Sequence, residues 1–145
     1  MLSHVEHMQE LVRPYVDDGT ILERSADEIA TNIRSYTLAF NNEKLIGFSA
    51  LHIHTTKLAE IRSLIVHESF RDKGVGKELV SLGLQEGETL GLQEVLVLTY
   101  KQAFFEKLGF VEIPKESLPE HKIWADCIKC KHFPLCNEVS LIKKY

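Results

Sequence analysis

Apolar residues recur at helical spacing near the start of the chain, at Val5, Met8, Leu11, Val12 and Tyr15. At the start of this stretch, Ser3 and Glu6 have the spacing of a capping box, in which each side chain bonds the backbone N–H of the other residue. This pattern predicts a first helix that ends near Tyr15. The same spacing at Ser25 and Glu28 predicts a second, short helix.

Strand-like runs follow these helices. Residues 36–40, 45–54 and 58–67 are predicted to form an antiparallel meander, with a hairpin turn at 41–44 between the first two strands. Simple alternation in the third strand places Glu60, Arg62, Leu64 and Val66 on one face and Ile61, Ser63 and Ile65 on the other. A β-bulge would break this register.

The second half of the chain predicts a crossover unit. A helix is expected from Val75 to about Thr89, and the apolar run at 94–98 is typical of a buried parallel strand. A short helix within 99–110 is expected to end at Gly109, and strands are expected at 123–126 and 138–143. The pattern indicates an α/β fold in a single domain, residues 1–145, with a mixed sheet flanked by helices on both faces.

Composition narrows the function classes. The 145 residues are 44% hydrophobic and 26% charged, and the net charge is −4. A mildly acidic balance argues against nucleic acid or an anionic membrane as the main partner. The apolar runs are too short to span a bilayer, and the first residues lack the apolar core of a secretory signal. A cytoplasmic location is therefore expected.

A glycine-containing turn joins the strand 58–67 to the following helix. It reads Arg71-Asp72-Lys73-Gly74-Val75-Gly76. The first N–H groups of a helix have no partner inside it, and the positive end of the helix dipole lies there. Glycine lets the backbone approach an anion, and Arg71, Lys73 and Lys77 add positive charge. The turn is therefore a candidate phosphate site, or else an ordinary strand-to-helix turn.

The pattern Arg-x-x-Gly-x-Gly after a strand resembles the acetyl-CoA pyrophosphate loop of GNAT N-acetyltransferases. The segment 104–110, Phe-Phe-Glu-Lys-Leu-Gly-Phe, is similar to a second GNAT signature, beside the pantetheine arm. Within the superfamily the chain resembles short bacterial N-acetylglutamate synthases, through residues 19–25, 59–64, 98–110 and 122–127. The resemblance implies a GNAT fold with a parallel strand pair, acetyl-CoA as co-substrate and L-glutamate as acceptor, which is the first step of arginine biosynthesis.

The resemblance also implies the residues that hold the cofactor. Backbone N–H groups near Leu64, Ile65 and Val66, where the parallel strands splay, would bind pantetheine and polarise the thioester carbonyl. Phe104 would lie beside the pantetheine arm. The pyrophosphate would be bound by residues of the turn, namely Arg71, Asp72, Lys73, Gly74, Val75, Gly76 and Lys77.

Catalytic and acceptor-binding residues are expected upstream and downstream of the turn. Glu60 is the candidate base for the ammonium group, and its alternative role is a salt bridge to Arg62. Many GNAT enzymes use a tyrosine as general acid, but Phe105 stands at that position, so Thr99 or Tyr100 is expected to orient a water instead. The candidate groups for the acceptor are Arg24, Arg62, Ser63 and Lys122.

Three cysteines, Cys127, Cys130 and Cys136, lie in one loop. With His121 or His132 they have half of a zinc signature, and the alternative is a loop of three reduced thiols. The second Cys-x-x-Cys pair of a strong zinc motif is missing, so no metal is expected. His52-x-His54 is interpreted as marking one face of a strand.

Two other functions remain open from the sequence. A GNAT enzyme could acetylate a protein N-terminus or another small amine, and a chain with Phe105 and clustered cysteines could be a non-catalytic CoA- or metal-sensing domain. GNAT chains usually begin with a strand, for which Met1-Leu2-Ser3 leaves no room. Either the start is internal to a longer protein, or the sheet edge is short and can pair with a second copy in a homodimer.

Overall fold

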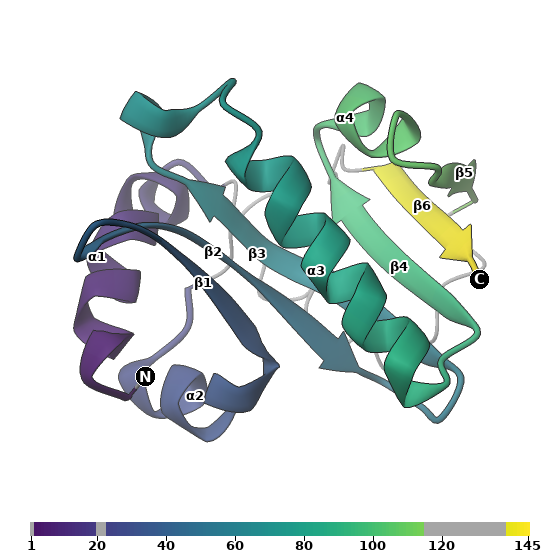
Figure 1. Ribbon diagram of the computed structural model, residues 1–145, viewed down its shortest axis with the longest axis horizontal. Helices are drawn as coiled ribbons and strands as arrows, with labels where there is room; N and C mark the ends of the chain where they lie inside the picture. The colour runs from purple at the N-terminus through teal and green to yellow at the C-terminus, as the bar shows by residue number, and fades with distance from the viewer. Residues whose placement is uncertain (1, 20–22, 115–138) are drawn as a thin grey trace.

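The computed structural model describes residues 2–19, 23–114 and 139–145. Its central element is a six-stranded mixed sheet in the order β1-β2-β3-β4-β6-β5, as Figure 1 shows. The strands are β1 (Tyr36–Asn41), β2 (Lys44–Ile53), β3 (Leu58–Val66), β4 (Glu94–Thr99), β5 (Val111–Ile113) and β6 (Val139–Lys144). The helices are α1 (Val5–Asp17), α2 (Ala26–Thr31), α3 (Val75–Leu90) and α4 (Gln102–Glu106), with short 3-10 turns at Leu2–His4, Ile33–Ser35 and Glu68–Phe70.

The sheet confirms the predicted α/β architecture. β1, β2 and β3 form an antiparallel meander, and β3 pairs with β4 in parallel through the crossover helix α3. β6 then lies antiparallel to β4, with β5 on its other side. The short strand β5 was not predicted, whereas the strand expected at 138–143 is β6. The strand expected at 123–126, Lys122 and the three cysteines lie outside the described residues.

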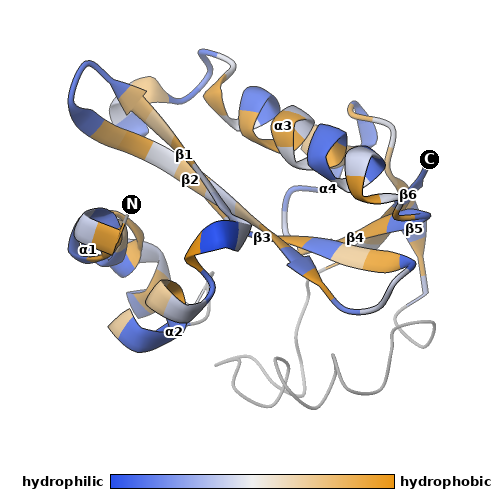
Figure 2. Ribbon diagram, turned by 60° about the horizontal axis from the view of Figure 1, so that its bottom comes forward, coloured by the Kyte–Doolittle hydropathy of each residue, from blue (hydrophilic) through white to orange (hydrophobic). Residues whose placement is uncertain are grey.

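Two apolar layers hold helices on opposite faces of this sheet, as Figure 2 shows for α1 and α2 on one side and α3 on the other. One layer joins Val80 of α3 and Phe105 of α4 to Ile61, Val97 and other residues of the sheet. The second joins α1 and α2 to the sheet through Val5, Met8, Ile29, Phe48 and Ile65. No helix in the described part of the chain is both long and apolar enough to cross a membrane.

Only one of the two predicted capping boxes forms. Ser25 Oγ accepts a hydrogen bond from the Glu28 N–H at 3.1 Å, and Glu28 Oε1 accepts one from the Ser25 N–H at 3.3 Å. The prediction at Ser3 was wrong, because residues 2–4 form a 3-10 turn and α1 begins after His4, which makes no side-chain cap. The same helix continues through Pro14 to Asp17, beyond its expected end.

A β-bulge at Ser63 overturns the simple alternation predicted for β3. Arg62 pairs with Ala50 and Ile65 with Phe48, so one residue of β2 faces two of β3. Ser63 has a φ of 58°, in the left-handed region. Leu64 therefore packs in the same layer as Ile61, whereas Ile65 joins the α1 side. The bulge thus reverses which side chains of β3 face each side of the sheet near the end of the strand.

Candidate active site

β3 and β4 diverge toward their carboxyl ends. Their parallel pairing runs from Leu58 opposite Glu94 to Ile61 opposite Val97, while β3 continues to Val66. Figure 1 shows the two arrows separating beyond that point, with α3 beginning near the diverging ends. Backbone groups of residues 64–66 thus lie on a strand edge that β4 no longer follows. Such an edge can bind an extended ligand through main-chain hydrogen bonds.

The N-terminus of α3 has the backbone geometry that the predicted anion site requires. Its N-cap is Gly74, with a φ of 83°, and the first hydrogen bond of the helix runs from the Glu78 N–H to the Gly74 carbonyl at 3.0 Å. The N–H groups of Val75, Gly76 and Lys77 therefore have no partner within the helix. A side-chain atom at Gly74 would meet no other atom within 4 Å, but its backbone conformation favours glycine.

Phe104 connects this helix start to the end of β3. A β-carbon at Gly76 would lie 3.5 Å from Phe104 Cζ and 3.7 Å from Val66 Cγ2. Three residues predicted to contact the cofactor from three separate segments are thus neighbours. The ring of Phe104 also meets Phe105 edge to face, with ring centroids 4.9 Å apart. Tertiary packing therefore places an aromatic wall beside the proposed pantetheine path.

The basic residues of the turn lie over aromatic rings. The Arg71 guanidinium lies 5.2 Å from the centroid of Tyr15 in α1, and Lys73 Nζ lies 5.6 Å from the centroid of Phe70. Each arrangement is a cation–π contact, which holds the charge near the turn while leaving it exposed to solvent. Asp72 has a φ of 62°, so the turn contains two left-handed residues, Asp72 and Gly74.

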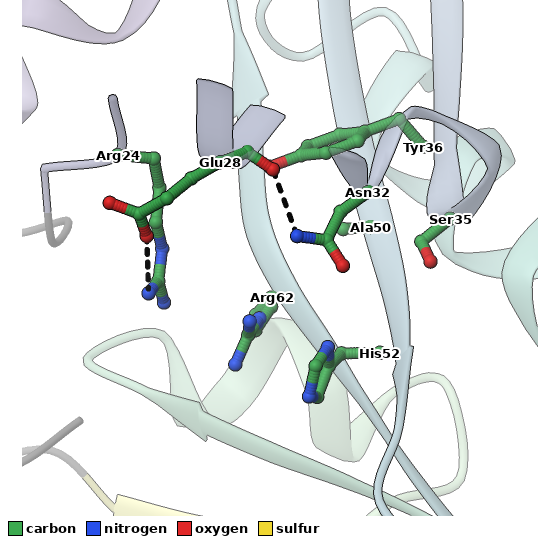
Figure 3. A pocket seen from close by; sticks show the side chains of 8 residues that line it. All are labelled: Arg24, Glu28, Asn32, Ser35, Tyr36, Ala50, His52 and Arg62. Carbon is green, nitrogen blue, oxygen red and sulfur yellow. Dashed lines mark hydrogen bonds and ion pairs between the residues drawn. The ribbon is translucent and has the colours of Figure 1, made fainter. Parts of the chain in front are cut away.

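A pocket opens on the other face of the sheet, beside α2. Its lining residues come from α2, the adjoining loops and the first three strands, and they are Arg24, Glu28, Asn32, Ser35, Tyr36, Ala50, His52 and Arg62. Figure 3 shows Arg24, His52 and Arg62 pointing toward the same side. The structure thus brings together the two arginines that the sequence named as acceptor groups. Gln9 of α1 supports the first of them by donating to the Arg24 carbonyl at 3.4 Å.

Charges in this pocket are partly balanced. Glu28 Oε2 lies 3.9 Å from Arg24 Nη1, and the Glu28 side chain is 48% exposed. Tyr36 lies in the same pocket, and burial raises the pKa of its phenol, although Arg24, Arg62 and a side-chain hydrogen bond with Ser63 act in the opposite direction. The phenol therefore stays neutral and can either donate or accept a hydrogen bond among the cations.

Glu60 is held by a partner that the sequence did not name. Its Oε1 lies 2.8 Å from His54 Nε2, and both side chains are buried, 2% exposed for Glu60 and 4% for His54. The His52 ring, which lines the pocket, meets the His54 ring edge to face at a centroid distance of 4.8 Å. The pair of Glu60 and His54 thus lies next to a residue of the pocket wall.

The remaining predicted groups lie at the end of β4 and in α4. Thr99 Oγ1 accepts a hydrogen bond from the Lys101 N–H at 2.9 Å, and Tyr100 is 42% exposed. Phe105, by contrast, is only 3% exposed and packs within the core. Its position supplies no hydroxyl, in agreement with the departure noted from the sequence.

Sequence reasoning missed Tyr36, His52 and His54 as site residues. His52 and His54 carried a signal, because residues two apart on a strand share a face, but nothing in the sequence showed that Glu60 would lie opposite His52. Tyr36 carried no signal of its own. Its proximity to Arg24, Arg62 and Ser63 arises only from folding.

Comparison with known proteins identifies the family. The sequence profile of the acetyltransferase (GNAT) family matches residues 5–110, more than half of the chain. The chain belongs to the GNAT family. An uncharacterized N-acetyltransferase of Chlorobaculum tepidum is 38% identical over 142 residues, which cover 98% of this GNAT chain and 91% of the relative. The protein is thus an acetyl-CoA-dependent N-acetyltransferase, with acetyl-CoA as its co-substrate.

Two further similarities relate this GNAT chain to larger proteins. An amino-acid acetyltransferase of Vibrio vulnificus is 28% identical over 115 residues, covering 78% of this chain but only 26% of the relative. A solved N-acetylglutamate synthase of Neisseria gonorrhoeae, complexed with coenzyme A and N-acetyl-glutamate, has a TM-score of 0.85 at 22% identity. The match covers 97% of this chain and 32% of the synthase chain, and it shows that the two share a fold.

Proposed function

We propose that this GNAT enzyme transfers the acetyl group of acetyl-CoA to the α-amino group of L-glutamate, the first step of arginine biosynthesis. The observation that carries the proposal is that Arg24 and Arg62 line one pocket. Glutamate has two carboxylates, and the planar guanidinium group binds a carboxylate through two parallel hydrogen bonds. Amino-acid acetyltransferases among the relatives support the same acceptor class.

The pocket offers more to a zwitterion than two cations. Glu28 lies 3.9 Å from Arg24, and an incoming carboxylate would take its place on the guanidinium. The neutral phenol of Tyr36 supplies a further hydrogen bond next to both arginines. Lys122, expected from the sequence as a third cation, stays a prediction.

The reaction requires proton removal from the acceptor before attack, because an α-amino group is mostly protonated at neutral pH. Glu60 takes a proton from the ammonium nitrogen, directly or through water, and the amine then attacks the thioester carbon. Main-chain N–H groups of residues 64–66 stabilise the tetrahedral oxyanion. When the C–S bond breaks, the extra proton on the nitrogen of the tetrahedral intermediate passes through a water oriented by Thr99 to the leaving thiolate, which gives the amide and free CoA.

A thiol-release assay across free amino acids tests the acceptor. We expect kcat/KM for L-glutamate to exceed that for glycine or lysine by about a hundredfold, since each well-placed charged hydrogen bond contributes about 1.5–3 kcal/mol. Turnover no better with glutamate than with glycine or lysine would overturn the assignment. Mass spectrometry of the product should show acetylation at the α-nitrogen.

An arginine variant tests the pocket directly. Arg24→Ala should raise KM for glutamate about tenfold or more while leaving KM for acetyl-CoA unchanged. Arg13→Ala is the matched control, because Arg13 is exposed on α1 and does not line the pocket. It should leave both KM values unchanged.

The second candidate acceptor is a protein N-terminus or another small amine. Glu28 favours it, because a half-exposed carboxylate in the pocket attracts a cationic acceptor. Such an acceptor needs no cation to bind it. An unchanged acceptor KM in the Arg24→Ala variant would therefore favour this alternative over glutamate.

A further inference from the structure

We propose that His54 is a positioning residue for acetyl transfer, which donates from Nε2 to Glu60 Oε1 and so holds the Glu60 carboxylate ionised and oriented beside the acceptor pocket. The inference rests on the proposed role of Glu60 as base. It does not depend on which amine is the acceptor. His54 itself touches neither substrate nor cofactor and acts only through Glu60.

The side chains of His54 and Glu60 are close enough for a strong hydrogen bond. Nε2 of His54 and Oε1 of Glu60 are 2.8 Å apart, a short distance typical of a hydrogen bond to a charged group. The two residues come from neighbouring antiparallel strands, His54 just after β2 and Glu60 within β3. The His54 N–H also donates from the backbone to the Leu58 carbonyl at 2.9 Å, which fixes the backbone from which its side chain extends.

Both side chains of the pair are buried, and His54 supplies a donor to the Glu60 carboxylate. A carboxylate that is 2% exposed is strongly disfavoured as an ion unless a donor compensates for its lost hydration. A pair buried in this way is weak evidence for stability, because apolar residues of similar size often replace such pairs without loss. Because such a pair contributes little to stability, a buried pair beside a pocket is a candidate for a functional role. The pair is therefore better explained by chemistry than by folding.

The pair of Glu60 and His54 lies next to the pocket that contains Arg24 and Arg62. Glu60 stands opposite His52 in the strand register, and His52 lines the pocket with Arg24 and Arg62. The edge-to-face contact of His52 with His54 packs the pair directly behind the pocket wall. A proton leaving an acceptor in this pocket therefore has a buried carboxylate nearby, and His54 determines how that carboxylate faces it.

Two amide variants that differ by one methylene group test the proposal. The amide nitrogen of glutamine can reach the position of His54 Nε2, whereas the shorter asparagine cannot. We expect His54→Gln to keep kcat within about threefold of the wild type. His54→Asn should lose kcat about tenfold or more, with a smaller change in the acceptor KM.

The pH profile separates positioning from a purely structural role. Without the donor, burial favours the protonated form of Glu60, so the acid limb of kcat in His54→Asn should move up by about one pH unit. The other ionisable residues that line the pocket are His52, Arg62, Arg24, Glu28 and Tyr36. None of these residues is altered in either variant. A shift of the acid limb of the kcat profile is therefore due to the loss of the hydrogen bond between residue 54 and Glu60. His7→Gln, at an exposed residue of α1, is the control and should match the wild type.

The experiment uses the full chain with whichever amine the thiol-release panel selects. If turnover favours another amine but His54→Asn shifts the limb and His54→Gln restores it, the proposed acceptor fails and the positioning role stands. If glutamate is the best acceptor but the Asn variant keeps the wild-type profile, the positioning role is overturned. Absence of turnover with every amine would overturn it as well. His54→Leu replaces the Asn variant if thermal unfolding or CoA binding shows that the latter does not fold.

Discussion

Gly74 is the N-cap of α3 and Gly91 is its C-cap, and the two have nearly the same backbone angle, φ of 83° and 84°. At both positions an added β-carbon would meet no atom within 4 Å. Alanine at either residue should therefore cost about 1–2 kcal/mol through the left-handed conformation alone. The two sites differ in one respect, because only Gly74 lies at the proposed pyrophosphate site.

Gly74→Ala should consequently weaken CoA binding about tenfold, since its methyl group enters the space that the phosphate would occupy. Gly91→Ala should leave the affinity unchanged. Isothermal titration calorimetry with CoA, together with urea unfolding of both variants, measures the two effects separately. Equal losses of CoA affinity in both variants would show that helix stability, rather than the anion site, controls binding.

The two Ser-x-x-Glu sequences should respond differently to mutation. Ser25→Ala removes a side chain that accepts from the Glu28 N–H at 3.1 Å, and it should cost about 1 kcal/mol of unfolding free energy. Ser3→Ala should change stability by less than about 0.5 kcal/mol, because His4 is the N-cap of α1 and no side chain caps it. Chemical denaturation measures both. A large loss at Ser3 would contradict the 3-10 start of the chain.

Tyr36 should make the protein less stable at alkaline pH. Burial raises the pKa of its phenol above the ordinary value of 10.0. Between the ordinary pKa of the unfolded chain and the raised pKa of the folded chain, the Tyr36 phenol loses its proton only when the protein is unfolded. The free energy of unfolding therefore falls as pH rises through this range. Tyr145 adds to this fall, because its pKa is also raised, by burial and by Glu88.

Tyr36→Phe should therefore lose less stability than the wild type above about pH 10, by at most about 1.4 kcal/mol per pH unit. Below that pH the two proteins should show the same slope. Urea unfolding at a series of pH values measures the difference. Parallel curves for the two proteins above that pH would contradict the raised pKa.

Phe105→Tyr tests whether the usual GNAT acid can be restored. Phe105 is 3% exposed and packs edge to face on Phe110, with ring centroids 5.4 Å apart. A hydroxyl added there lies in an apolar layer, so we expect a loss of about 1–3 kcal/mol of stability and no gain in kcat. Thermal unfolding and the thiol-release assay measure both. A higher kcat would show that the new hydroxyl reaches the leaving thiolate.

Local patterns predicted most of the fold. The crossover from β3 through α3 to β4 follows from an apolar run, a glycine turn and a helical period, all of which are short-range features. The cap at Ser25 formed as predicted, but the one at Ser3 did not, because a cap requires the chain to enter the helix at that residue. The bulge at Ser63 depends on pairing with β2 and has no local signature.

By itself, the sequence determined the family and the glycine turn that begins α3, because both depend on neighbouring residues and backbone geometry. Tertiary structure alone decided which side chains share the pocket beside α2. Arg24, Tyr36, His52 and Arg62 come from four separate segments, and only sheet pairing and the docking of α2 bring them together. The pairing of His54 with Glu60 arises in the same way, since the register of β2 against β3 sets which residues meet.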